Sequence, residues 1–119
     1  MAGAVVQCLD HTLAAEVRRR CPEATTGITL HGRALDPVGV ARSAGARLIS
    51  GDASFTVRQD VEALHAAGIG WMVAEELRLP GAAETPEALA ASVRRLLGAG
   101  TDIIVTDDVA ACRARVGGL

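Results

Sequence analysis

The chain has 119 residues with a formal net charge of −2 and a pI near 5.9, and 50% of its residues are apolar while 2% are aromatic. This balance gives no uniform electrostatic attraction for nucleic acid or for acidic membranes, so neither partner is favoured. No apolar stretch approaches the roughly 18 residues that cross a bilayer, and no basic region precedes the first apolar residues. We therefore expect no membrane span and a cytoplasmic location.

Five short apolar runs, taken in chain order, predict β-strands separated by helical segments. The predicted strands are Val5–Leu9, Gly27–Leu30, Arg47–Ser50, Ile69–Val73 and Asp102–Thr106. Two of the intervening segments carry the apolar spacing of a helix that packs on a sheet. Their stripes are Leu13, Val17 and Cys21 in the first, and Val57, Val61 and Leu64 in the second. Alternating strands and helices predict right-handed crossovers between parallel strands.

Local signals mark where the predicted helices begin and end. A glycine that can adopt the left-handed conformation precedes three strands, and these residues are Gly45, Gly68 and Gly100. Capping patterns mark three helix starts, which are Asp36-Pro37, Thr56 with Gln59, and Thr85-Pro86. The Pro80–Ala83 stretch predicts a loop after the fourth strand. The three cysteines have no C-x-x-C spacing and are expected to be small buried residues in a reducing compartment.

These elements predict an α/β fold with about five β/α units, arranged as a partial TIM-type (β/α) barrel in a single domain, residues 1–119. A complete barrel of eight units needs roughly 250 residues, so this interpretation implies a missing part. An open doubly wound sheet is the alternative of suitable size. Its nucleotide-binding version is disfavoured because the segment from Asp10 to Leu13, and not a glycine-rich loop, follows the first strand.

Polar side chains follow all five predicted strands, at the end where parallel β/α structures place their sites. The candidate cluster consists of Asp10, His31, Asp52 and Glu75. Crowded carboxylates beside an imidazole could bind a cation or share a proton. Helix capping is the competing interpretation for Asp10, Asp107 and Asp108, and solvation is the competing one for Glu75 and Glu76. His65 falls inside a helix at the opposite end of its unit, which indicates a structural or a surface histidine.

Three segments resemble the C-terminal portion of the glycerophosphodiester phosphodiesterase family of metal-dependent β/α barrels. Gly100–Asp107 (GTDIIVTD) is similar to the closing strand of the family, and Leu64–Trp71 (LHAAGIGW) is similar to the helix and strand that lead to its Trp-Thr-x-Asn motif. Val5–Asp10 (VVQCLD) resembles the strand that ends in Ser-Phe-Asp. The resemblance covers nearly the whole chain and implies that its strands correspond to barrel strands four to eight.

The resemblance also implies what this chain lacks. The family's His-Arg-Gly motif, Glu-x-Asp metal pair, second catalytic histidine and third-strand glutamate belong to the first three strands, so no catalytic and no metal residue is carried over. A complete member would use Mg²⁺ or Ca²⁺. Cys8 and Leu9 stand in place of Ser-Phe, and Met72 and Ala74 replace Thr and Asn, which removes hydrogen-bonding groups from the pocket. Trp71 remains as a substrate-binding candidate, with core packing as its alternative.

Three functional hypotheses follow from these observations. The first is the C-terminal part of a glycerophosphodiester phosphodiesterase-like protein, inactive alone and acting on a glycerophosphodiester once the N-terminal barrel part is supplied. The second is a non-catalytic assembly or binding module, for which unclosed strand edges predict self-association into a dimer or larger species. The third is an independent enzyme that uses the four-residue candidate cluster around a cation.

Overall fold

The computed structural model describes residues 4–74, 86–106 and 109–116, in which strands and helices alternate along the chain. The strands are β1 (Val5–Cys8), β2 (Thr25–Thr29), β3 (Leu48–Gly51), β4 (Gly70–Ala74) and β5 (Ile103–Val105). The helices are α1 (His11–Arg20), α2 (Pro37–Ser43), α3 (Arg58–Ala66), α4 (Pro86–Gly98) and α5 (Val109–Val116), with a short 3₁₀ helix, η1 (Ala53–Phe55), after β3. All five predicted strands are confirmed, with bounds shifted by one or two residues.

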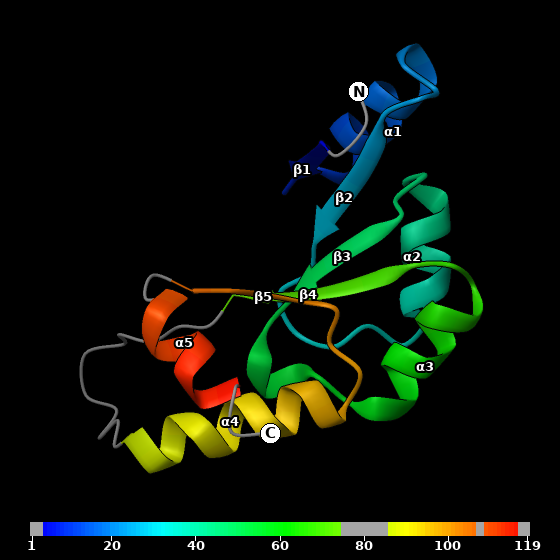
Figure 1. Cartoon of the computed structure of the whole chain (residues 1–119). Helices are drawn as coiled ribbons and strands as arrows, with labels where there is room; N and C mark the ends of the chain where they lie inside the picture. The colour runs from blue at the N-terminus through cyan, green and yellow to red at the C-terminus, as the bar shows by residue number, and fades with distance from the viewer. Residues whose placement is uncertain (1–3, 75–85, 107–108, 117–119) are drawn as a thin grey trace.

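The five strands form one parallel sheet in the order β1-β2-β3-β4-β5. Figure 1 shows this sheet curving, with α2, α3 and α4 along its convex side. Strand order therefore follows chain order without the reversal that defines a doubly wound sheet. The partial barrel is confirmed and the open doubly wound alternative is wrong.

Side chains alternate between the two faces of the sheet, and the helix-side face carries the core. Ile28 pairs with Ile49, Ile49 with Trp71, and Val73 with Ile104, which places these residues on one face. Ile28, Ile49 and Val73 are fully buried there, and helix residues Val61, Leu64 and Leu96 pack in the same cluster. Apolar burial of this kind is the main stabilising contribution to the fold.

The opposite face, here called the inner face, carries no helix in the described part of the chain. Its residues alternate with the core positions and include Val5, Gln7, Thr29, Ser50, Met72, Ile103 and Val105. Val5, Ile103 and Val105 are 46%, 44% and 46% exposed. In a closed barrel this face would point to the barrel axis and be filled by layers of side chains.

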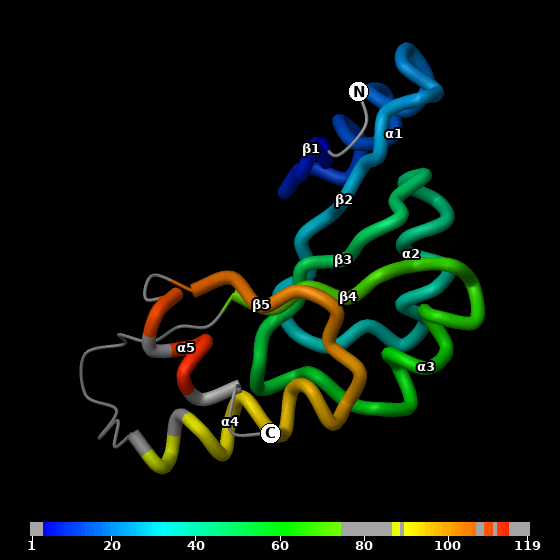
Figure 2. The backbone as a smooth tube through the Cα atoms, in the orientation of Figure 1, coloured from blue at the N-terminus to red at the C-terminus, as the bar shows by residue number. Residues whose placement is uncertain are grey.

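The sheet is an open arc, because β1 and β5 lie at opposite ends of the strand order and do not pair. Figure 2 shows the backbone of β1 and β5 at the two ends of the arc. The radius of gyration is 15.0 Å, whereas a compact domain of this length has about 13.5 Å. No helix within the described residues is long and apolar enough to cross a bilayer.

Most of the predicted helix signals are confirmed. Gly45, Gly68 and Gly100 have φ values of 65°, 75° and 99°, so each ends a helix in the left-handed conformation. Asp36 caps α2 through a hydrogen bond from Gly39 N–H to its Oδ1 at 2.9 Å, and Pro37 begins the helix. The capping role of Thr85 and the loop at 80–83 lie outside the described residues.

Two local predictions are wrong. Thr56 does not cap α3: Val57 is the N-cap, without a side-chain cap hydrogen bond, because the Thr56 hydroxyl is used inside the core. Leu13 does not face the sheet, since it is 53% exposed while its neighbour Ala14 is fully buried. The prediction of buried cysteines is confirmed for Cys8 and Cys112, while Cys21 is partly exposed and its thiol donates a hydrogen bond to Glu23.

Candidate functional site

The candidate site lies at the carboxyl edge of the sheet, where loops after parallel strands converge. Asp10 follows β1, His31 follows β2 by two residues, and Asp52 directly follows β3. Glu75 lies outside the described residues. Of the four predicted cluster residues, the structure brings His31 and Asp52 together.

Asp10 serves as the N-cap of α1. Its Oδ1 accepts hydrogen bonds from the Thr12 backbone N–H at 2.9 Å and from the Thr12 hydroxyl at 2.6 Å. These hydrogen bonds hold the pKa of Asp10 below its ordinary value, with the Thr12 hydroxyl as the largest cause. The capping alternative considered for this residue is therefore confirmed, and its carboxylate is engaged in a local structural role.

His31 and Asp52 form a polar pair on the rim of the sheet. The distance between His31 Nδ1 and Asp52 Oδ1 is 3.6 Å, and the other carboxylate oxygen accepts a 3.0 Å hydrogen bond from Gly32 N–H. The carboxylate is thereby held in place while the imidazole side chain remains 74% exposed. An exposed imidazole beside a fixed carboxylate is able to bind a polar ligand or to act as a hydrogen-bonding group toward one.

A second ion pair fixes the loop that carries His31. Arg33 donates to both carboxylate oxygens of Asp60, at 2.7 and 3.1 Å, which joins the loop after β2 to the first turn of α3. This pair raises the pKa of the Arg33 guanidinium, chiefly through its hydrogen bonds with Asp60. The loop after β2 is consequently tied at two points, to Asp52 just after β3 and to Asp60 in the first turn of α3.

The other two histidines are already engaged in hydrogen bonds. His11 Nε2 lies 2.9 Å from the Thr29 carbonyl oxygen, which ties α1 to the end of β2. His65 Nε2 lies 2.7 Å from Asp102 Oδ2, an oxygen that also accepts the Trp71 backbone N–H at 2.8 Å. Asp102 precedes β5, so this pair sits at the amino edge of the sheet, away from the candidate site. The structural role predicted for His65 agrees with this position.

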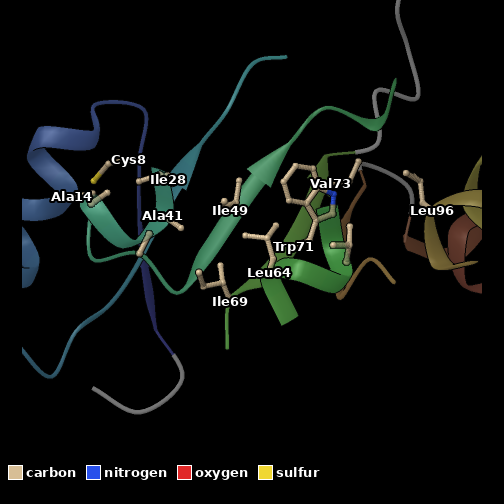
Figure 3. Close-up of a cluster of buried hydrophobic side chains, with 13 residues drawn as sticks. Cys8, Ala14, Ile28, Ala41, Ile49, Leu64, Ile69, Trp71, Val73 and Leu96 are labelled. Atoms are coloured by element: carbon tan, nitrogen blue, oxygen red, sulfur yellow. The ribbon is translucent and has the colours of Figure 1, made fainter. Parts of the chain in front are cut away.

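Trp71 lies in the core between the sheet and the helices, with 5% of its surface exposed. Figure 3 shows its indole among the buried side chains, near Leu64 and Val73. The indole N–H donates to the Thr56 hydroxyl at 3.0 Å, and the ring lies against Gly51, where any Cβ would overlap it. The packing alternative therefore describes Trp71 in this structure, while a direct contact with substrate stays a prediction.

Thr56 and Arg95 are site-supporting residues that the sequence patterns did not identify. The Arg95 guanidinium donates to the carbonyl oxygens of Ala53 and Thr56 at 2.6 and 3.2 Å. Since Thr56 also donates to the Asp52 carbonyl at 3.0 Å, α4 helps to hold the turn that positions Asp52. The segment after β3 carries no local signal of this role, because the partner of Thr56 lies 39 residues later in the chain.

The described residues do not form a divalent-cation site by themselves. No three His, Cys, Asp or Glu side chains come together in the part of the chain that the structure describes. A Mg²⁺ or Ca²⁺ site needs several oxygen ligands, and His31 with Asp52 provides one carboxylate. These residues therefore do not fit a metal centre unless further ligands are supplied.

The fold of this chain is similar to part of several solved structures. A protein from Silicibacter pomeroyi described as a glycerophosphoryl diester phosphodiesterase aligns with 23% identity and a TM-score of 0.73, over 96% of this chain and 38% of its own. The Oleispira antarctica phosphodiesterase, solved in complex with the product sn-glycerol-3-phosphate, aligns with 12% identity and a TM-score of 0.73, over 95% of this chain and 41% of its own.

A Galdieria sulphuraria protein described as a glycerophosphodiester phosphodiesterase aligns with 16% identity and a TM-score of 0.77, over 95% of this chain and 43% of its own. No family model and no curated protein matches the sequence. The chain thus spans about two fifths of the length of these solved structures. Its open five-stranded arc has the fold of a C-terminal part of the glycerophosphodiester phosphodiesterase barrel.

Proposed function

We propose that this chain forms the C-terminal wall, strands four to eight, of a glycerophosphodiester phosphodiesterase-like barrel that hydrolyses phosphodiesters of glycerol when the rest of the barrel is present. The observation that supports this proposal is the fold match over 95% of the chain to the Oleispira antarctica enzyme, whose product is a glycerol phosphate. Such a protein would act in glycerophospholipid metabolism, and we place it in the cytoplasm.

The contribution of this chain is structural and positional. The helix-side core holds the curvature of the sheet, and the two carboxylates Asp52 and Asp60 fix the loop that carries His31. His31 therefore projects from a fixed loop at the edge where barrel sites lie. In this position its imidazole would bind the phosphodiester or exchange a proton with it, as part of a pocket completed from elsewhere.

The metal and the main reactive groups are assigned to the missing part. Because the described residues form no cation site, we attribute no metal step to this chain, and the Mg²⁺ or Ca²⁺ of a complete barrel would need ligands outside it. The partner is then the N-terminal barrel part or, as in the assembly-module alternative, a second copy of the chain. That alternative has no observation that favours it over the first.

The test is a hydrolysis assay on a fusion. The N-terminal part of the Oleispira antarctica phosphodiesterase, up to the region that aligns with this chain, is joined to residues 1–119. Release of glycerol 3-phosphate from glycerophosphocholine is measured with Mg²⁺ and with Ca²⁺. We expect turnover by the fusion and none by either part alone. Turnover by residues 1–119 alone would contradict the proposal, and so would an inactive fusion that is correctly folded by circular dichroism.

His31 provides a residue-level prediction with a matched control. In the fusion, His31→Gln should lower kcat/KM by tenfold or more, because a positioned acid, base or hydrogen-bonding group is worth at least that much. His65→Gln removes the other histidine–aspartate pair, at the opposite edge of the sheet, and should change kcat/KM by less than twofold. Equal losses in the two variants would show that His31 contributes only to stability.

The independent-enzyme hypothesis has its own test. Asp10 is engaged as a helix cap, so the predicted four-residue cluster does not assemble around His31 and Asp52 within the described residues. Calorimetric titration of the isolated chain with Mg²⁺, Mn²⁺ and Ca²⁺ should show no saturable binding. Stoichiometric binding with a dissociation constant in the micromolar range would restore this hypothesis.

A further inference from the structure

The inner face of the sheet changes from polar to apolar between β3 and β4. The register pairs Thr29 with Ser50 and Ser50 with Met72. Met72 in turn pairs with Ile103, so one row of side chains crosses four strands. The members of this row on β2 and β3 carry hydroxyls, whereas those on β4 and β5 are apolar. The polar half extends to β1, because the Gln7 side-chain amide donates to the Thr29 hydroxyl at 3.1 Å.

The next row towards the carboxyl edge repeats this division. β3 ends one residue before Asp52, whose backbone is extended, so the register between β3 and β4 continues and sets Asp52 beside Ala74. Ala74 pairs with Val105 on β5. This row therefore has the polar pair of His31 and Asp52 on one side and two apolar residues on the other. Both rows change character at the same boundary between strands.

The apolar half of the two rows, here called the apolar wall, consists of Met72, Ala74, Ile103 and Val105. Ile103 and Val105 are 44% and 46% exposed, and Ala74 is exposed as well. No side chain of the wall carries a hydroxyl, an amide or a charge. A polar group placed against the wall would lose its hydrogen bonds to water without replacing them. An alkyl chain in the same place would be stabilised by burial.

The apolar wall borders the candidate site and is not confined to the barrel interior. Layers of side chains fill a β/α barrel, and its site lies beyond them at the carboxyl end of the strands. Ala74 and Val105 share the row of Asp52, the last one at that end. A ligand that contacts the exposed imidazole of His31 would therefore meet the wall on its β4 and β5 side.

We propose that the apolar wall binds the second alcohol of the phosphodiester, and that this alcohol is an alkyl chain instead of a charged or hydroxylated group. This specificity rests on the proposed function and names its substrate class, which is esters of glycerol 3-phosphate with long-chain alcohols. The glycerol phosphate part lies over the polar half of the inner face. Water adds to phosphorus, the bond from phosphorus to the alkyl oxygen breaks, and that oxygen takes up a proton, which gives glycerol 3-phosphate and the free alcohol.

The fusion of the N-terminal part of the Oleispira antarctica phosphodiesterase to residues 1–119 tests this preference. Release of glycerol 3-phosphate is compared between its n-octyl ester, kept below the critical micelle concentration, and glycerophosphocholine, with Mg²⁺ and with Ca²⁺. We expect kcat/KM to favour the octyl ester by about tenfold or more, because several of its methylene groups would be buried against the wall. Equal values, or a preference for glycerophosphocholine, would overturn the proposal.

Substitutions that keep the shape of a side chain assign the preference to the wall. Met72→Gln and Val105→Thr each add a polar group, so each should lower the ratio of kcat/KM for the octyl ester to that for glycerophosphocholine by about fivefold or more. Val6→Thr is the matched control, since Val6 pairs with Thr26 on the helix-side face of β1, and it should leave the ratio unchanged. A ratio that falls equally in all three variants would contradict the role of the wall. Because the ratio compares two substrates on one protein, partial unfolding of a variant does not alter it.

Methyl NMR spectra of residues 1–119 give a readout that needs no turnover. The octyl ester should shift the methyl resonances of Met72, Ile103 and Val105, while glycerophosphocholine at the same concentration should not. Leu35 and Val109 are 108% and 61% exposed outside the wall, so they report non-specific binding of the alkyl chain and should stay unshifted. Equal shifts at all five residues, or no shift at the wall, would overturn the proposal.

The two proposals fail in different ways. Shifts confined to the wall, without release of glycerol 3-phosphate from either ester by the folded fusion, would leave the alkyl-binding wall standing and refute the hydrolytic function. Hydrolysis of glycerophosphocholine at least as efficient as that of the octyl ester would refute the specificity and leave the hydrolytic function standing.

Discussion

The buried hydroxyl of Thr56 offers a quantitative test of how the core is held. It accepts the indole N–H of Trp71 at 3.0 Å and donates to the Asp52 carbonyl at 3.0 Å, and Thr56 and Trp71 are each 5% exposed. Thr56→Val keeps the shape of the side chain and removes both hydrogen bonds. The indole N–H would then be buried without an acceptor, which costs about 2 kcal/mol of the free energy of unfolding. For a chain of this length that corresponds to a Tm lowered by about 8 °C.

Urea unfolding followed by far-ultraviolet circular dichroism measures this change. Fluorescence is an independent probe in variants that keep Trp71, because the chain has one Trp and no Tyr. Thr56→Ser is the control: it keeps both hydrogen bonds and loses one methyl group, at a cost of about 1 kcal/mol. In a Trp71→Phe background, which has no indole donor, Thr56→Val should cost at least about 1 kcal/mol less than in the native chain. Equal costs in the two backgrounds would refute the stabilising role of this hydrogen bond.

Two further stability predictions concern packing and capping. Gly51→Ala should destabilise the chain by about 1–3 kcal/mol, because a Cβ there would overlap the Trp71 ring. Gly98→Ala is the control in α4: its Cβ would meet open space, so the substitution should be neutral or stabilising. Similar urea midpoints for the two variants would contradict the packing described. Asp10→Ala should lower stability at neutral pH through loss of the α1 cap. Because the folded-state pKa of Asp10 lies below its ordinary value of 3.8, the contribution of its ionised form is present above that pH and is lost as the pH falls through the folded value. The difference in free energy of unfolding between the native chain and Asp10→Ala should therefore become smaller in acid, while the effect of Asp10→Ser on this free energy should not depend on pH. Parallel profiles of unfolding free energy against pH for the native chain and Asp10→Ala would contradict the capping role of the Asp10 carboxylate.

Local sequence signals were sufficient for most of the fold. Apolar runs located all five strands, and the glycines at 45, 68 and 100 located three helix ends, because both signals depend on residues adjacent in the chain. The start of β2 was placed two residues late, since Thr25 and Thr26 are polar in type. Thr26 is nevertheless fully buried, with its hydroxyl donating to the Gly45 carbonyl at 2.9 Å. That partner could not be read from a local pattern.

The candidate site was less accessible from the sequence. Strand-end positions identified His31 and Asp52, but the same rule also selected Asp10, which the structure uses as a cap. Position relative to a strand cannot separate these outcomes, because a short carboxylate before a helix serves equally well as a cap or as a ligand. The distinction needed the hydrogen-bond partners of each carboxylate.

By itself, the sequence determined the β/α alternation, the parallel arrangement and the shortage of strands for a closed barrel, since all three follow from periodicity, turn residues and length. The tertiary structure alone decided that Trp71 belongs to the core and that Leu13 is exposed. It also decided that the Thr56 hydroxyl accepts a hydrogen bond from the Trp71 indole instead of capping α3. These outcomes depend on contacts between residues far apart in the chain and on which face of the sheet is covered. Periodicity shows that a residue belongs to a face, but only packing shows what covers that face.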